Sequence, residues 1–472
     1  MNNSKLISIL KTLTARELNA LEKLVNSAFF NVNEDVSALF ILLKKIHPEF
    51  DEKQTNKKSV YKKLFPGKRF NEQVLRYVMT DLTRLLEEFL VQKQFSENET
   101  LRKHLLMQSL NQRDLDKYFL QHINDAYEVQ KKSPYRDALF YERQAMLEED
   151  SYSWTSRKDN RAIDSSLQSL VDNIDIHYLT KKLKYSCEII NRMNVLKVQY
   201  NISFLDNTLE FLKQNSFSHV PAIMVYFQVL LTLRESENEV HYRKLKTLLA
   251  EHIDKFPNSE LRDIYGFIQN YCIRQINLGN NNYLRELFEN YKILLEKEII
   301  IEDGSLAQFD FKNIVTISLR LDEFKWTEKF IEKYSLLLSA DFRKNAINYN
   351  LARLHYSKKQ YRDALRLLLA VEFTDVYYHL DSKSLLLRIY YDLEDWEPLL
   401  SLFNTFKIYL KRNKLISEYQ RTTYTNLVKF VRKLTRIKMG SKLPLERVKQ
   451  EIEEVKQIAD LTWLQSKVEE LK

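Results

Sequence analysis

Apolar and polar positions alternate at helical spacing through most of the chain, and residues 345–375 show this pattern most clearly. Two apolar stripes, each with steps of three or four residues, lie on either side of a short polar turn at 357–360. Stripes of this period are the buried faces of helices, so the segment predicts two helices joined by a tight turn. The stripes consist of Leu351, Leu354 and Tyr356, and then Tyr361, Ala364, Leu365 and Leu368.

The same hairpin pattern returns 35 residues further along the chain. A hairpin of this kind cannot bury its apolar face alone, so neighbouring copies are expected to stack into a continuous core. The recurring positions are apolar, aromatic or arginine: Leu351 and Leu386, Arg353 and Arg388, Leu354 and Ile389, Tyr356 and Tyr391, Tyr361 and Trp396, Leu365 and Leu400, and Leu368 and Phe403.

Small and aromatic residues at particular positions give the repeat a family likeness. The small Ala352 lies on the first helix, Tyr361 opens the second, and Ala364 stands where the two helices cross closely. With these residues the segment resembles a tetratricopeptide repeat. Trp326, 35 residues before Tyr361, indicates a further, diverged copy, and the resemblance extends over residues 220–412.

The resemblance implies an α-α superhelix of stacked hairpins whose first helices line a concave groove for a peptide. Arginine and tyrosine suit such a groove, because planar guanidinium and phenol groups combine contact area with directed hydrogen bonds. The alternative is that the two arginines only pair with local acids such as Asp392. The groove positions that the resemblance implies are Tyr349, Arg353, Tyr356, Ser384, Arg388 and Tyr391.

The whole chain is predicted to be all-α, because five glycines and seven prolines among 472 residues are too few for the turns of a β-rich fold. A polar run at 151–160 is the clearest internal joint. We expect four parts: an N-terminal helical domain at 1–95, helical hairpins of unclear repeat type at 100–200, tetratricopeptide-like repeats at 203–440, and a C-terminal capping helix at 443–472.

Within the first part, a short helix at 59–65, a basic turn at 66–71 and a long helix at 72–91 give a weak helix-turn-helix look-alike. DNA reading is the less favoured interpretation, since acids on the outward face of the long helix would repel phosphate. An end cap or docking domain is favoured instead. The acids concerned are Asp81, Glu87 and Glu88.

Positive charge is concentrated near the C-terminus. The chain has a net charge of +9, while residues 405–442 hold eleven Lys or Arg and a single acid, Glu418. Such a concentration attracts an acidic protein segment or a polyanion. The alternative is a solvated face that acids such as Glu451 partly neutralise. On a helix at 417–438 the predicted basic patch is Arg421, Lys429, Arg432, Lys433 and Arg436.

The sequence predicts no catalytic residue, metal site or cofactor. Its glycines are scattered, no His-Glu-x-x-His motif occurs, and Cys187 and Cys272 are expected to be buried thiols. No apolar run is long enough to span a membrane and no secretory signal is evident, so a cytoplasmic location is expected. We therefore expect a non-enzymatic scaffold that binds a peptide or helical segment of a protein partner in the groove. The alternative is a nucleic-acid-binding or regulatory protein that uses residues 405–442.

Overall fold

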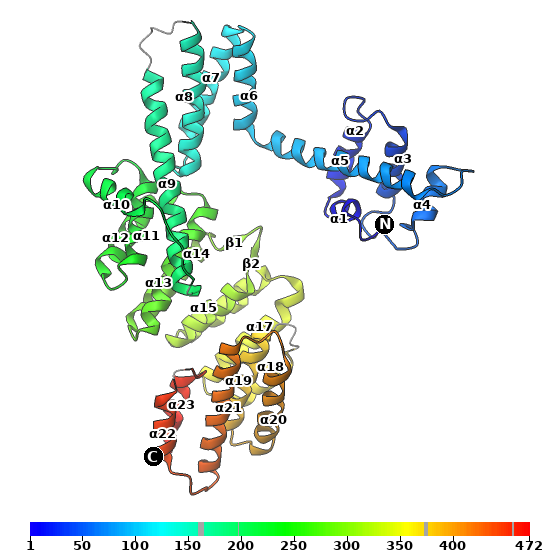
Figure 1. Ribbon diagram of the computed structural model, residues 1–472. Coiled ribbons are helices and arrows are strands. Elements are labelled where there is room, and N and C mark those ends of the chain that lie inside the picture. The colour runs from blue at the N-terminus through cyan, green and yellow to red at the C-terminus, as the bar shows by residue number, and fades with distance from the viewer. Residues whose placement is uncertain (159–164, 197, 372–375, 456) are drawn as a thin grey trace. The chain divides into compact units, whose positions relative to one another are not determined.

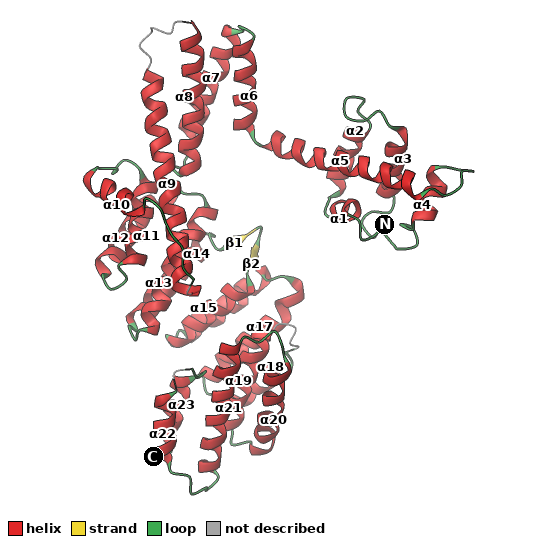
Figure 2. Ribbon diagram, viewed as in Figure 1, coloured by secondary structure: helices red, strands yellow, loops and turns green. Residues whose placement is uncertain are grey.

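The computed structural model contains two units, Met1–Tyr178 and Leu179–Lys472. Both consist of α-helices, which confirms the predicted all-α fold (Figure 1, Figure 2). Within the described residues the only strands are the short antiparallel pair β1 (Ile301–Glu302) and β2 (Ser305–Leu306). No described helix is both long enough and apolar enough to cross a membrane. The structure describes residues 1–158, 165–196, 198–371, 376–455 and 457–472.

Asparagine side chains begin four consecutive helices of the first unit, α3 to α6. Asn33, Asn56, Asn71 and Asn98 each accept a hydrogen bond from a backbone N–H in the first turn, and Thr14 makes a capping box with Glu17. The helices are α1 (Lys5–Leu10), α2 (Ala15–Val25), α3 (Glu34–Lys44), α4 (Lys57–Leu64), α5 (Glu72–Glu97), α6 (Glu99–Gln112), α7 (Asp116–Lys132), α8 (Ala138–Lys158) and the first part of α9 (Ser165–Leu196).

Helices α1 to α5 enclose one apolar core, in which Leu21, Phe40 and Leu86 are fully buried. The long helix α5 continues past the predicted end at residue 91, to Glu97, so that Asn98 alone separates it from α6. The apolar stripe predicted this helix correctly but not its last turns, because those turns are polar.

The polar run at 151–160 is not the expected joint, because α8 continues through Lys158. The Trp154 ring stacks on Phe119 at 5.8 Å between centroids, and its Nε1–H donates to Asp116 Oδ1 at 2.9 Å. Lys158 pairs with the same carboxylate at 2.5 Å. These contacts with α7 hold a polar sequence in a helix. Residues 159 and 160 lie outside the described residues.

The second unit continues with helices that are mostly joined by short turns (Figure 1). They are the remainder of α9, α10 (Leu205–Gln214), α11 (Pro221–Arg234), α12 (Glu239–His252), α13 (Asn258–Asn277), α14 (Asn282–Glu296), α15 (Gln308–Arg320), α16 (Phe324–Tyr334), α17 (Ala340–Ser357), α18 (Tyr361–Leu369), α19 (Val376–Asp392), α20 (Trp396–Arg412), α21 (Glu418–Lys438), α22 (Leu445–Glu454) and α23 (Leu461–Glu470), with 3-10 turns at Ile253–Lys255 and Ser335–Leu337.

Consecutive helices of this unit pack as pairs, for example α17 with α18 and α19 with α20. Alternate helices also pack on one another, so that α15, α17, α19, α21 and α23 follow each other in a row. One continuous core runs from Tyr349 to Val468 and includes Leu387, Phe406 and Leu434. This arrangement is compatible with a helical solenoid, as the repeat predicted.

Three hairpin turns share a left-handed residue that is not glycine. Asp322, Lys359 and Glu394 have φ angles of 56°, 61° and 55°. In each turn the next residue's N–H reaches back across the helix end, as when Gln360 N–H donates to His355 O at 2.8 Å. This is the Schellman closure that glycine usually provides. The scarcity of glycine therefore does not prevent tight helical turns.

The aromatic residues that open the second helices have similar surroundings in two copies. Tyr361 lies 5.4 Å from Tyr356, and Trp396 lies 6.2 Å from Tyr391, measured between ring centroids. In the third copy, Trp326 stacks on Phe330 at 5.3 Å within its own helix. The 35-residue period is thus repeated in the packing of the last two copies.

The tail at 443–472 is two helices rather than the single capping helix expected. α22 ends at Glu454 and α23 begins at Leu461, with Asp460 in the left-handed region at a φ of 50°. Ala459 N–H donates to Thr423 O at 3.3 Å, and Asn426 Nδ2 donates to Gln457 O at 2.8 Å. These contacts with α21 take up backbone groups that a continuous helix would have paired internally.

Candidate functional site

Four of the six predicted groove residues line one hollow of about 270 Å³ in the second unit. They come from α17 and α19, which pack side by side, and α15 and α21 complete the wall. Arg353 and Arg388 therefore face a shared space. The lining residues are Lys312, Thr316, Tyr349, Arg353, Asp381, Ser384, Leu385, Arg388, Tyr424, Ala459 and Asp460.

Arg388 is engaged by the chain's own tail. Its Nη1 donates to Asp460 Oδ1 at 3.2 Å, and Ser384 Oγ donates to the other carboxylate oxygen. The guanidinium stacks on the Tyr356 ring at 4.5 Å and lies 5.8 Å from Trp463. Burial opposes the charge of Arg388, but the Asp460 carboxylate and the Tyr356 phenol outweigh it and raise its pKa.

Tyr356 and Tyr391 do not line the hollow: Arg388 and Asp392 contact Tyr356, and the tail packs on Tyr391. The Tyr356 hydroxyl donates to Asp392 Oδ2 at 2.5 Å, and the same aspartate pairs with Lys467 of α23 at 2.7 Å. Burial raises the pKa of Tyr356 well above its usual value. Tyr391 is 1% exposed and packs edge-on against Trp463 at 5.4 Å. The local acid Asp392 thus hydrogen-bonds to Tyr356 and not to an arginine. Arg388 pairs instead with Asp460, which belongs to the tail.

Arg353 has a different environment. Its Nη1 donates to the neutral Thr316 Oγ1 at 2.6 Å, and its guanidinium lies 5.8 Å from the centre of the Tyr349 ring. No carboxylate in the described part of the chain pairs with it. Of the three cations that line the hollow, Arg353 is therefore the one with no carboxylate partner among the residues that the structure describes.

The two acids of the hollow are both already paired. Asp381 makes an ion pair with Lys312 and accepts a hydrogen bond from the Tyr424 hydroxyl at 2.6 Å. Asp460 is held by Ser384 and Arg388 as described. Residues 312, 381, 424 and 460 were not among the predicted site residues. Period analysis could not find Asp460, because the apolar stripe of the tail continues across it.

A second hollow of about 360 Å³ lies in the same unit, among residues that come earlier in the chain, and is rich in amide side chains. Asn270 Nδ2 donates to Asn191 Oδ1 at 3.1 Å, whereas Arg274 has no ion-pair partner among the described residues. Side-chain amides can pair with a peptide backbone, since each offers a donor and an acceptor. The lining includes Asn191, Asn194, Asn270, Arg274 and Asn277.

The predicted basic patch on α21 is partly neutralised. Lys429 and Lys433 lie 3.6 Å and 2.5 Å from the carboxylate of Glu451, which belongs to α22. Arg421 Nη2 donates to the carbonyls of Asn413 and Ile416, at the turn after α20. Hydrogen bonding to Lys433 lowers the pKa of Glu451, which keeps this carboxylate charged.

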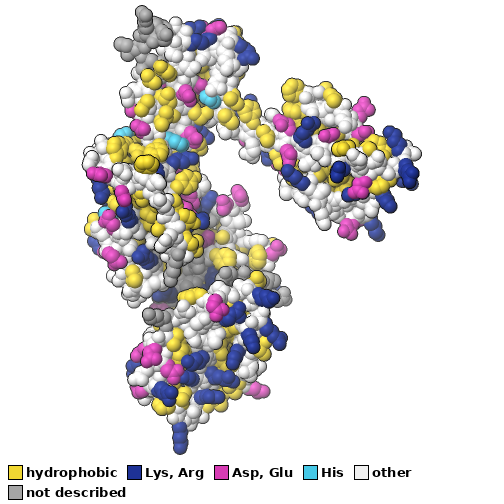
Figure 3. Space-filling view, viewed as in Figure 1, with side chains coloured by type: hydrophobic (Ala, Val, Ile, Leu, Met, Phe, Trp, Pro, Cys, Tyr) yellow, Lys and Arg dark blue, Asp and Glu magenta, His cyan; other side chains and the backbone are white. Residues whose placement is uncertain are grey.

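Other cations nearby remain open to solvent. Lys and Arg side chains gather on the face of α20 and α21 that Figure 3 shows in the lower part of the view. Leu415 and Tyr419, in and just after the turn between these helices, are 78% and 63% exposed. We call the cations of α20, of the turn at 413–417 and of α21 that have no carboxylate partner among the described residues the basic surface; they are Lys407, Lys411, Arg412, Lys414, Arg432 and Arg436.

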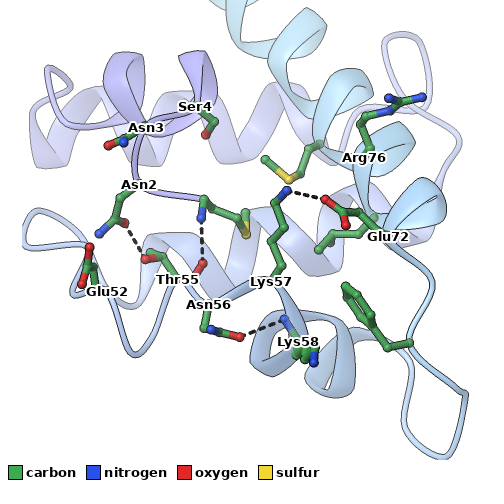
Figure 4. Close-up of a pocket in the computed structure, with 14 residues that line it drawn as sticks. Asn2, Asn3, Ser4, Glu52, Thr55, Asn56, Lys57, Lys58, Glu72 and Arg76 are labelled. Atoms are coloured by element: carbon green, nitrogen blue, oxygen red, sulfur yellow. Dashed lines mark hydrogen bonds and ion pairs between the residues drawn. The ribbon is translucent and has the colours of Figure 1, made fainter.

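The first unit has an open cavity of about 900 Å³ beside α1, α4 and α5. Figure 4 shows Lys57 reaching across to Glu72, a contact of 2.5 Å. The Met1 amino group donates to Thr55 O at 3.1 Å. In the helix-turn-helix look-alike, the first residue of the long helix α5, Glu72, thus forms an ion pair with Lys57 of α4. The side chains that line this cavity are mixed in charge, with Glu52 and Glu72 beside Lys57, Lys58 and Arg76, and they do not favour a ligand of one charge.

Groups that could support chemistry are buried or dispersed. Burial raises the pKa of the Cys187 thiol well above its usual value, and that of Cys272 to about 12, so both are held as thiols. Among the residues that the structure describes, no His, Cys, Asp and Glu side chains gather as a metal site. The comparisons with protein-family models, curated proteins and solved structures found no match for this chain.

Proposed function

We propose that this protein is a non-enzymatic interaction scaffold that binds a peptide segment of a protein partner. The observation that carries the proposal is the hollow between α17 and α19, which faces outward from stacked helices and is lined by arginine, tyrosine and serine side chains. A wall of packed helices is formed before the partner arrives, so binding costs little ordering of the scaffold. The tetratricopeptide-like character of the hairpins and a cytoplasmic location belong to the same proposal.

The chain's own tail supports this reading of the hollow. Ala459 and Asp460, which precede α23, form part of its lining, and the Asp460 carboxylate bonds to Arg388. Next to the hollow, backbone groups of Ala459 and Gln457 bond to Thr423 and Asn426. A segment of non-helical peptide is therefore a ligand that this wall accommodates. The amide-rich hollow near Asn270 offers a second contact area on the same unit.

Photo-crosslinking from inside the hollow tests the proposal. A photoreactive amino acid replaces Thr316, which lines the hollow, and in the control it replaces Arg362, an exposed residue of α18. Illumination in native cell extract is expected to give a discrete protein adduct from position 316 that withstands nuclease and is absent from position 362. A Thr316→Trp variant, which fills the hollow, should lose the same partner. Equal labelling from both positions would argue against the scaffold.

The basic surface supports a second candidate, a nucleic-acid-binding or regulatory protein. Its six unpaired cations and the exposed ring of Tyr419 are what a phosphate backbone and unstacked bases require. Binding of a labelled single-stranded oligonucleotide would then fall steeply between 50 and 200 mM salt, on the order of tenfold or more. Reversing Lys407, Lys411 and Arg436 to Glu should abolish it, while Lys429→Glu should have a smaller effect because Glu451 already neutralises that lysine.

A further inference from the structure

Two arginines one repeat apart face the same hollow and differ in their partners. Arg388 stacks on a tyrosine ring and holds the carboxylate of Asp460. Arg353 lies over the ring of Tyr349 but contacts only the neutral hydroxyl of Thr316. The contacts of Arg388 therefore show, within the chain itself, the kind of group that Arg353 can bind.

The charges of the hollow point to the same group. Its lining contains three cations, Lys312, Arg353 and Arg388, and two carboxylates, Asp381 and Asp460. Lys312 is paired with Asp381, and Arg388 with Asp460. One positive charge is left over, and it belongs to Arg353. A ligand group with a single negative charge would neutralise Arg353 and accept a charge-assisted hydrogen bond from its guanidinium.

We propose that Arg353 receives the side-chain carboxylate of an aspartate or glutamate in a non-helical segment of the partner. This inference rests on the proposed function and names the chemistry of its ligand. A carboxylate fits better than a phosphate, because Asp381 and Asp460 in the wall repel a second negative charge. An internal side chain rather than a chain end is indicated, since the model ligand is Asp460 within its own continuous backbone.

The route of the tail indicates how such a segment is held. Next to Asp460, the backbone of Ala459 donates to a carbonyl of α21, and the Asn426 amide donates to the carbonyl of Gln457. The scaffold therefore contacts main-chain groups on one side of the acid and the carboxylate itself. A helical ligand could not offer these main-chain groups, because its own hydrogen bonds use them.

A peptide copied from the tail provides a chemically matched probe. Its sequence is QIADLTW, blocked at both ends and labelled with fluorescein. In the control peptide QIANLTW, asparagine replaces the aspartate, which removes the negative charge and leaves one accepting oxygen. Fluorescence polarisation with the full-length protein measures both affinities. The variants are Arg353→Gln, which can still bond to Thr316, and Arg362→Gln as a matched control on α18. Far-UV circular dichroism checks that each variant is folded.

The expected result is a preference of the wild-type protein for the aspartate peptide by roughly tenfold or more. The preference should disappear in Arg353→Gln and persist in Arg362→Gln. Equal affinities for the two peptides, no binding of either, or a preference that survives Arg353→Gln would overturn the inference. If Arg353→Gln does not fold, Thr316→Val serves instead: it removes only the neutral partner of Arg353, so the preference must be kept, and its loss would overturn the inference.

The crosslinking experiment separates this inference from the function on which it rests. A protein adduct from position 316 that forms equally well in the wild type and in Arg353→Gln would leave the scaffold standing and refute the role of Arg353. The absence of any adduct from position 316 would refute the scaffold itself. An adduct that is lost only in Arg353→Gln supports both.

Discussion

Replacing Asp460 by asparagine is the sharpest test of how the tail is held. Asparagine keeps the size of the side chain and tolerates the left-handed backbone at this position, where φ is 50°. The substitution removes the negative charge that Arg388 and Ser384 share, and it replaces one of the two accepting oxygens with an amide N–H₂ donor. A hydrogen bond to a charged group contributes about 1.5–3 kcal/mol when it is well buried. Since the two side chains are 23% and 29% exposed, we expect a loss of about 1–2 kcal/mol.

Hydrogen exchange measured by mass spectrometry is the appropriate assay, because it reports local opening in a protein with two units. A loss of 1–2 kcal/mol corresponds to about a 5- to 30-fold fall in amide protection over residues 457–471. Glu453→Gln, at an exposed position of α22, is the matched control and should leave protection unchanged. In a double-mutant cycle, Arg388→Gln combined with Asp460→Asn should cost less than the two single changes added together. Strict additivity, or unchanged protection in Asp460→Asn, would refute the reasoning.

Three further predictions concern the hairpins. Lys359→Gly should stabilise the protein by about 0.5 kcal/mol, because relief of the left-handed strain exceeds the added flexibility of the unfolded chain; a lower thermal midpoint would contradict this. Leu387→Ala should cost about 3–5 kcal/mol in urea denaturation, since Leu387 is 0% exposed, and a loss below 1 kcal/mol would show that the site collapses freely. Burial and then the nearby Lys383 charge lower the pKa of His379 to about 4 from an ordinary 6.5, so the unfolded chain takes up this proton first as the pH falls. Stability should therefore decline between pH 6.5 and 4, and His379→Gln should have a shallower decline in the urea midpoint; an identical slope would exclude this residue as the cause.

The sequence predicted the features that depend on local period. The hairpins of α17 to α20 follow from apolar residues at helical spacing, and Tyr361 and Trp396 do open the second helices. The left-handed turns at Lys359 and Glu394 were not predicted, because neither residue type signals that conformation. Helices also continued through polar stretches, since contacts such as that of Trp154 with Asp116 come from a different helix. Apolar residues at helical spacing reveal the buried face of a helix. They do not reveal polar stretches that are helical because side chains of a neighbouring helix contact them.

For the candidate site, the sequence predicted four of the side chains that line the hollow, but it did not predict which groups they bind. Arg353 and Arg388 occupy the same position of the repeat, so a single sequence treats them alike. What distinguishes them is the tail, more than 70 residues after Arg388, which brings Asp460 to one arginine and not to the other. The stripe from Val448 to Val468 gave no indication of this, because a backbone that turns between two helices can keep an apolar residue at each expected step.

The difference between the two arginines follows from the end of a stacked array. Each hairpin of a solenoid is covered by the next, and the last one has no successor, so another element must cover it. Here α23 packs against α21, and Lys467 pairs with Asp392 while Trp463 packs on Tyr391. Covering the last repeat therefore requires the tail to pass Arg388, and the carboxylate that compensates this arginine is part of the cover. Arg353 lies one repeat further in and receives no such group from the tail. Its charge stays available to a ligand that comes from outside the chain.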